Sequence, residues 1–194
     1  MAKAPISTPN FEKPDTEIDD AKLADVAAEA PHVKAPSPQF YAISDVYGAM
    51  GSPDCTKGRV IIRAPRGETA WSLDLACHKL VELPFQQFFD ALLVKGLYAL
   101  IGQISPIYVP NDVLDGLYPP VYSPRAWGVA VALNAGMNHA GIIPPRTDPA
   151  EEGAKFRFWH GHPVVKLAQE FGFTWGGGIE VMPHSSLFMA CGLP

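Results

Sequence analysis

Apolar residues recur at helical spacing in two parts of the chain. In residues 83–95 (LPFQQFFDALLVK) they return every three or four positions, which predicts an amphipathic helix with Pro84 in its first turn and Gly96 at its end. Residues 163–172 (PVVKLAQEFG) show the same spacing between a proline and a glycine. They predict a second, shorter helix whose apolar side faces the protein interior.

Short continuous apolar runs predict the strands. Branched aliphatic residues dominate residues 59–64 (RVIIRA), and residues 127–135 (WGVAVALNA) are almost wholly apolar, as in a strand buried on both faces. Residues 98–109 (YALIGQISPIYV) predict one or two strands broken at Pro106, and residues 185–192 (SSLFMACG) predict the last strand. Helices and strands are mixed along the chain without a regular strand–helix–strand order. The pattern therefore predicts an α+β fold with a small antiparallel sheet flanked by helices.

The remaining stretches have other compositions. Residues 112–124 and 138–162 combine proline, glycine and charge, which is typical of loops. Residues 1–40 carry only isolated apolar positions among Pro, Ala and charged residues, and such a segment cannot offset its ordering entropy alone. We expect an extended or partly helical N-terminal arm over residues 1–40, with a disordered tail as the alternative, and a globular domain over residues 41–194.

Composition narrows the classes of function. A chain of 194 residues that is 47% hydrophobic can bury one substantial core. Its formal net charge of -5 argues against a nucleic-acid partner, because nucleic-acid binders concentrate Lys and Arg on one face. No apolar run approaches the roughly 20 residues of a membrane span. The first residues also lack the apolar core of a secretory signal peptide, so we expect neither a membrane span nor export by that route.

The cysteines suggest no dedicated chemistry. Cys55, Cys77 and Cys191 are widely spaced, without the close pairs of a structural zinc site. We expect free or buried thiols, with a disulfide as the alternative outside a reducing compartment. Cys77 precedes His78, but neighbouring side chains on a regular element diverge, so a cysteine-protease pair is not expected.

Several motifs in a fixed order carry a family resemblance. They are residues 76–102 (ACHKLVELPFQQFFDALLVKGLYALIG), residues 123–138 (SPRAWGVAVALNAGMN), residues 162–177 (HPVVKLAQEFGFTWGG) and a late histidine. Together they resemble the zinc D-alanyl-D-alanine carboxypeptidases of the VanY-like type, which occur among bacterial cell-wall enzymes and phage endolysins. The resemblance covers approximately residues 59–192 and implies the DD-carboxypeptidase/hedgehog-like form of an α+β fold.

The zinc ligands of that family are largely missing here. Its signature has the form S-x-H-x-x-G-x-A-x-D-[LI]-N, and its matching residues in this chain are Ser123, Gly128, Ala130, Leu133 and Asn134. The resemblance puts Arg125 at the histidine position, Ala132 at the aspartate position and His184 at the third ligand position. A catalytic zinc needs three protein ligands, and a guanidinium has no lone pair to donate. We therefore expect no metal, no cofactor and no catalytic residue.

Two further family positions are also altered. The resemblance implies an acidic general base three residues before the late histidine, where this chain has Val181, with Glu180 one position too early. It also implies a substrate-binding arginine before the signature strand, and residues 105–122 contain none. Functional positions are lost while the packing residues persist, so the sequence predicts a scaffold without its reaction.

We therefore expect a catalytically inactive peptidoglycan-peptidase-like domain in a phage virion, at the tail tip or baseplate, whose arm binds other virion proteins. One alternative is an active zinc peptidase or endolysin with a rearranged site built from His139, His160, His162 and His184, although His162 also suits a helix cap. The other is a non-hydrolytic module that binds peptidoglycan. Its residual groove would hold Ser123, Trp127, Asn134 and Trp175.

Overall fold

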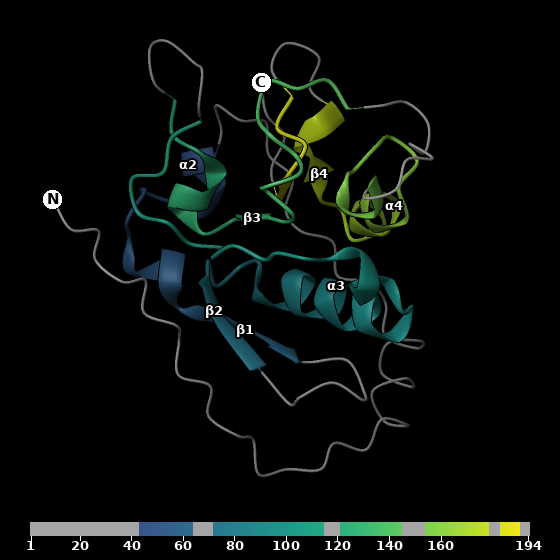
Figure 1. Ribbon diagram of the computed structural model, residues 1–194. Helices are drawn as coiled ribbons and strands as arrows, with labels where there is room; N and C mark the ends of the chain where they lie inside the picture. The colour runs from purple at the N-terminus through teal and green to yellow at the C-terminus, as the bar shows by residue number, and fades with distance from the viewer. Residues whose placement is uncertain (1–42, 64–71, 115–120, 145–153, 179–182, 191–194) are drawn as a thin grey trace, which may run out of the picture.

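The computed structural model describes residues 43–63, 72–114, 121–144, 154–178 and 183–190. The arm expected over residues 1–40 lies outside these ranges. The described helices are α2 (Ile43–Tyr47), α3 (Glu82–Val94) and α4 (Pro163–Glu170). The described strands are β1 (Gly58–Arg63), β2 (Ser72–Cys77), β3 (Ala130–Ala132), β4 (Thr174–Trp175) and β5 (Leu187–Met189). The predicted mixture of helices with small antiparallel sheets is confirmed (Figure 1).

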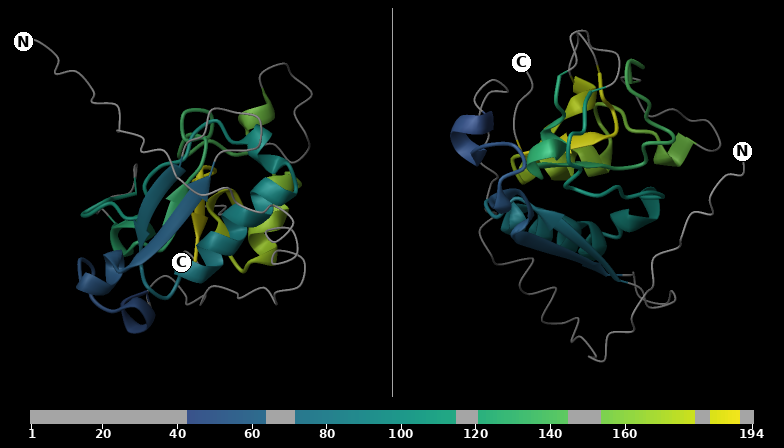
Figure 2. Two further views of the ribbon diagram at one scale, coloured as in Figure 1. Left: turned by 90° about the horizontal axis from the view of Figure 1, so that it is seen from below. Right: turned by 90° about the vertical axis from the view of Figure 1, so that its left-hand side faces the viewer.

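The strands form two antiparallel sheets where the sequence predicts one. β1 pairs with β2, from Gly58 opposite Cys77 to Arg63 opposite Ser72. The second sheet has the order β3-β5-β4, so the last strand of the chain is its central one. In Figure 2, β1, β2 and α3 lie on one side of the molecule, and the second sheet lies with α4 on the other.

Both predicted helices are confirmed close to their expected bounds. α3 ends where Gly96 adopts a left-handed conformation with φ of 67°, which glycine adopts without a steric penalty. α4 is preceded by His162, whose Nδ1 accepts a hydrogen bond from the backbone N–H of Val164 at 3.1 Å. His162 is therefore the helix cap that the sequence predicts.

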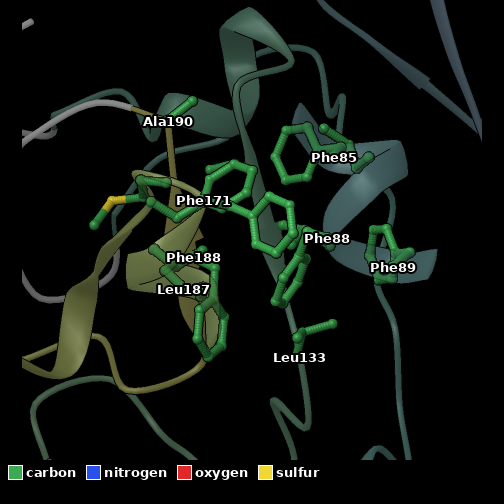
Figure 3. Close-up of a cluster of buried hydrophobic side chains, with 14 of the residues drawn as sticks. Phe85, Phe88, Phe89, Leu133, Phe171, Leu187, Phe188 and Ala190 are labelled. Atoms are coloured by element: carbon green, nitrogen blue, oxygen red, sulfur yellow. The ribbon is translucent and has the colours of Figure 1, made fainter. Parts of the chain in front are cut away.

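Aromatic side chains join the two halves of the core. Phe88 of α3 contacts Phe171 beyond α4 and Phe188 of β5, with ring centroids 6.2 Å and 6.3 Å apart. Figure 3 shows these rings between the helix and the strands. The buried apolar residues from Ile43 to Ala190 form one cluster. Because burial of apolar area stabilises by about 25 cal/mol per Å², this cluster holds the two sheets in one folded unit.

Residues 98–109 do not form the predicted strands. The described chain has a 3₁₀ turn at Leu97–Leu100 and then a single bridge between Ile104 and Leu133. The side chain of Asn134 binds the amides of Gly102 and Gln103, so these groups are not available to a neighbouring strand. The buried apolar residues of this segment, Tyr98 and Ile107, belong to the core cluster and not to a strand.

Other differences concern short elements. The strand predicted over residues 127–135 is limited to β3, because Pro124–Trp127 forms a 3₁₀ turn that Gly128 ends. Strand β2 and helix α2 are not predicted from the sequence, because their apolar residues are too few for a clear period. Within the described residues, no helix has the length and apolar character needed to cross a membrane.

Candidate functional site

The signature positions singled out by the resemblance meet at one pocket. Arg125, Ala132 and His184 all line a pocket with a volume of about 230 Å³. Arg125 comes from the 3₁₀ turn before β3, Ala132 from β3 and His184 from the segment before β5. Residues far apart in the chain are thus brought together where the sequence analysis expects a lost metal site.

The local sequence fixes the backbone of Arg125. Ser123 precedes the turn, and its hydroxyl oxygen accepts a hydrogen bond from the N–H of Arg125 at 3.3 Å. Gly128 ends the turn with φ of 71° and donates its N–H to the carbonyl of Arg125 at 3.0 Å. That carbonyl also accepts from the N–H of Val109 at 3.0 Å. Two signature residues therefore position a side chain that cannot bind zinc.

The Arg125 side chain is held by oxygen atoms of the preceding loop. Its Nε–H donates to the carbonyl of Pro106 at 3.3 Å. Its Nη1 lies 3.6 Å from a carboxylate oxygen of Asp112. Their side chains are 18% and 23% exposed, so this ion pair is mostly shielded from water. Asp112 also lines the pocket.

His184 reaches the pocket through backbone pairing. Its N–H donates to the carbonyl of Gly176 at 3.0 Å, and the residue forms a bridge with Ala140. A Cβ atom at Gly176 would lie 2.6 Å from the His184 carbonyl oxygen, so only glycine permits this approach. Gly176, the first residue of the 3₁₀ turn Gly176–Gly178, is thus what places His184.

The residues at this pocket do not fit the zinc ion that the resemblance implies. The three positions that the resemblance assigns to zinc ligands supply the imidazole of His184, the methyl group of Ala132 and the guanidinium of Arg125. A guanidinium stays protonated and repels a divalent cation, so a firmly held ion with an open position for water cannot form from these groups. No group of three or more His, Cys, Asp or Glu residues in the described ranges is arranged to hold a metal.

The four histidines of the alternative metal site do not converge. His139 lines the same pocket as His184. His160 instead packs edge-on against Trp175, with ring centroids 5.3 Å apart. His162 is buried against Phe158 and caps α4. Of the four histidines, His139 and His184 therefore share a pocket, and His160 and His162 do not line it.

Of the four groove residues named from the sequence, only Ser123 lines the pocket. Asn134 is 2% exposed, and its amide bonds the backbone of Gly102, Gln103, Leu100 and Phe156. Trp175 is buried and donates to the carbonyl of Ser185, whereas Trp127 donates to the carbonyl of Gly48. The structure does not gather these four side chains around one groove.

The cysteine and histidine pair at the end of β2 is structural. Burial raises the pKa of the Cys77 thiol to about 12, with a smaller contribution from Glu82. Burial lowers the pKa of His78, whose Nε2 lies 3.0 Å from the carbonyl of Tyr47. Cys55 and Cys77 are free thiols. A thiol held protonated is a poor nucleophile.

Some expected positions lie outside the described residues. They are Cys191, Glu180 and Val181. The pocket residue that the sequence analysis missed is Asp112, which belongs to a loop recognised only by its turn composition. A loop aspartate carries no periodic signal, and its proximity to Arg125 depends on the hydrogen bond from the N–H of Ser123 to the Asp112 carbonyl.

Comparisons with models of protein families, with curated proteins and with solved structures found no match for this chain.

Proposed function

We propose that this chain is a non-catalytic relative of the peptidoglycan peptidases, with the DD-carboxypeptidase/hedgehog-like form of the α+β fold, and a structural component of a phage virion. The observation that carries the proposal is the pocket shared by Arg125, Ala132 and His184. Of these three positions only His184 has a side chain that binds metals, so they do not supply the ligands that a zinc-bound water needs.

The signature positions that match the family pattern support a retained scaffold. Ser123 caps the turn before β3, Gly128 ends it, and Asn134 ties the end of β3 to two other segments. Each of these roles serves the fold and needs no metal. A chain that keeps the structural positions and loses the ligands fits a domain reused for its shape.

The virion role rests on the family analogy and on residues 1–40. A segment of that composition suits ordering on a neighbouring protein, since association supplies the apolar contacts that the segment lacks. A tail tip or baseplate contains many such neighbours.

One pair of measurements tests the loss of the reaction. The purified full-length chain is equilibrated with zinc, dialysed and measured for metal content, and it is incubated with purified peptidoglycan to detect released peptides. We expect less than one zinc per chain and no release. Stoichiometric zinc together with chelator-sensitive cleavage would instead assign an active peptidase with a rearranged site.

Two measurements test the virion role. Mass spectrometry of purified particles should detect the chain, and antibody labelling in electron micrographs should mark the tail. Absence from particles that contain all other tail proteins would contradict the assignment.

A second candidate is a module that binds the cell wall without cleaving it. It is favoured by the polar character of the pocket, where Ser123, Asn138 and His139 accompany Arg125. Sedimentation with purified peptidoglycan separates the two candidates. Retention of the chain on the pellet supports the binding module, and a chain that stays in the supernatant supports the purely structural role.

A further inference from the structure

Arg125 carries hydrogen-bond donors that the fold does not use. A guanidinium has N–H donors on every nitrogen and no acceptor. The Nε–H donates to Pro106, whereas Nη1 lies 3.6 Å from Asp112, beyond hydrogen-bond length. Among the described residues, the terminal N–H groups of Arg125 therefore make no hydrogen bond.

A cavity adjoins this residue. Arg125 lines the pocket of about 230 Å³ together with the polar residues Ser123, His139 and Ser186. The hydroxyl oxygen of Ser123 accepts from the Arg125 amide, which leaves the hydroxyl proton for another acceptor. The Arg125 side chain is 18% exposed, and none of its nitrogens is both buried and unpaired, so an acceptor that enters the pocket can replace water at its terminal N–H groups. The pocket has room for such an acceptor.

We propose that this pocket binds a carboxylate group through the terminal N–H groups of Arg125. A planar guanidinium matches the two oxygens of a carboxylate with parallel hydrogen bonds. Asp112 already balances part of the positive charge, so a singly charged carboxylate fits better than a phosphate group with up to about two charges. The ligand is a small organic acid or the carboxyl end of a peptide.

The pocket size agrees with a small ligand. Its volume of about 230 Å³ lies below the roughly 300–1,000 Å³ of pockets that enclose drug-sized molecules. One carboxyl group with a short substituent therefore fits, and the rest of a longer ligand would extend into solvent.

Asp112 limits the affinity of this site. Its carboxylate lies beside the guanidinium that the ligand approaches, and like charges at short range repel. Removal of the Asp112 charge should therefore strengthen carboxylate binding. This inference goes beyond the proposed function, because a chain that hydrolyses nothing can still bind a carboxylate.

Titration calorimetry at low salt tests the site in the full-length chain. The probes are acetate, N-acetyl-dialanine with a free carboxyl end and the same peptide with a carboxamide end. Binding of acetate and of the acid peptide with similar affinity assigns a small-acid site, and binding of the acid peptide alone assigns a site for chain ends. Equal binding of the carboxamide, or no binding of either acid, would overturn the proposal.

Three variants locate the binding. Arg125→Gln should weaken carboxylate binding by about tenfold or more, because charge-assisted hydrogen bonds are lost. Arg59→Gln is the matched control, since exposed Arg59 of β1 pairs with Asp74 at 2.7 Å and does not line the pocket. Asp112→Asn should tighten binding.

The variant outcomes are decisive in either direction. If Arg125→Gln binds as tightly as the control, the site is elsewhere and the proposal fails. If Asp112→Asn weakens binding, the ligand has a positive group at Asp112 and the carboxylate assignment is wrong. If Arg125→Gln does not fold, Arg125→Lys replaces it in the test. Lysine keeps the charge without the planar pair of donors, so this variant should also weaken binding.

Discussion

The guanidinium of Arg125 lies 3.6 Å from the carboxylate of Asp112 in a pocket that His184 also lines. The resemblance places a zinc-binding histidine at this arginine. If the resemblance holds, a cation and its counter-ion stand where that family has a metal ligand. A divalent ion would meet both electrostatic repulsion from Arg125 and a missing donor at Ala132.

Rebuilding the ligands should create a zinc site. We expect Arg125→His combined with Ala132→Asp to bind zinc, because two donors then join His184 around one cavity. Zinc should raise the unfolding temperature of this double variant and leave that of the natural chain unchanged, since a ligand that binds only the folded state stabilises it.

The controls for this experiment use the same pocket. Addition of His184→Ala to the double variant should abolish the zinc-dependent shift. Because Ala132 is 4% exposed, an aspartate there is costly without metal, and the double variant should be less stable than the natural chain in the presence of a chelator. A double variant that folds but whose unfolding temperature does not change with zinc would show that the signature has been aligned incorrectly.

Asn134 should be the most sensitive polar residue of the core. Its side chain accepts from the amides of Gly102 and Gln103 and donates to the carbonyls of Leu100 and Phe156. Asn134→Ala leaves these buried groups without a partner, so we expect a loss of about 3 kcal/mol or more in the free energy of unfolding. Urea denaturation measures this loss.

Asn111 provides the matched control. It also has positive φ, 58° against 50° for Asn134, but it is exposed. Asn111→Ala should therefore cost no more than about 1–2 kcal/mol, from backbone conformation alone. Equal losses in the two variants would mean that the side-chain hydrogen bonds of Asn134 contribute little.

Helices α3 and α4 and strands β3 and β5 could be predicted because their signals are periodic or continuous. The α3 face with Phe85, Phe88 and Phe89 is buried as its spacing requires. β3 and β5 are buried at every position, which matches their continuous apolar sequences. An element buried on one face has periodically spaced apolar residues, and an element buried on all faces has a continuous apolar run. Either pattern can be recognised without knowing which residues pack against it.

The errors arise where tertiary contacts replace regular pairing. Residues 98–109 are apolar enough for a strand, yet a single distant side chain, Asn134, binds two of their amides. The proximity of Asp112 to Arg125 likewise depends on loop geometry. Arg125, Ala132 and His184, which the resemblance singles out, do line one pocket, but the resemblance carries no information on the residues that complete the lining.

Gly128 should tolerate no side chain. A Cβ atom there would lie 2.5 Å from the Cys55 carbonyl oxygen and 2.9 Å from the His78 amide nitrogen, in a backbone with φ of 71°. Gly128→Ala combines left-handed strain with overpacking, so we expect a loss of about 2–5 kcal/mol in unfolding free energy.

Gly48 separates the two contributions. Its φ is 74°, and a Cβ atom there would meet nothing within 4 Å. Gly48→Ala should therefore cost only about 1–2 kcal/mol from the backbone conformation. If both variants lose the same stability in urea denaturation, the close contacts at Gly128 relax without cost and the prediction fails.

His78 should make the stability of the fold fall in mild acid. Its side chain is 1% exposed, its Nδ1 accepts from the N–H of Leu80 at 3.2 Å, and its Nε2 lies 3.0 Å from the Tyr47 carbonyl. These contacts need the neutral ring. Burial lowers the pKa of His78 in the folded state, although the hydrogen bond to Tyr47 and the charge of Asp54 act in the opposite direction.

The sign of the pH effect follows from this lowered pKa. Below the ordinary histidine pKa of about 6.5 the unfolded chain binds a proton that the folded chain does not, so acidification favours unfolding. His78 should contribute a loss of up to about 1.4 kcal/mol per pH unit in the free energy of unfolding in this range.

Urea denaturation midpoints above and below about pH 6.5 measure this loss. In His78→Gln this part of the loss should disappear, whereas the same substitution at exposed His160 should retain it. An unchanged pH dependence in His78→Gln would assign the acid sensitivity to other groups.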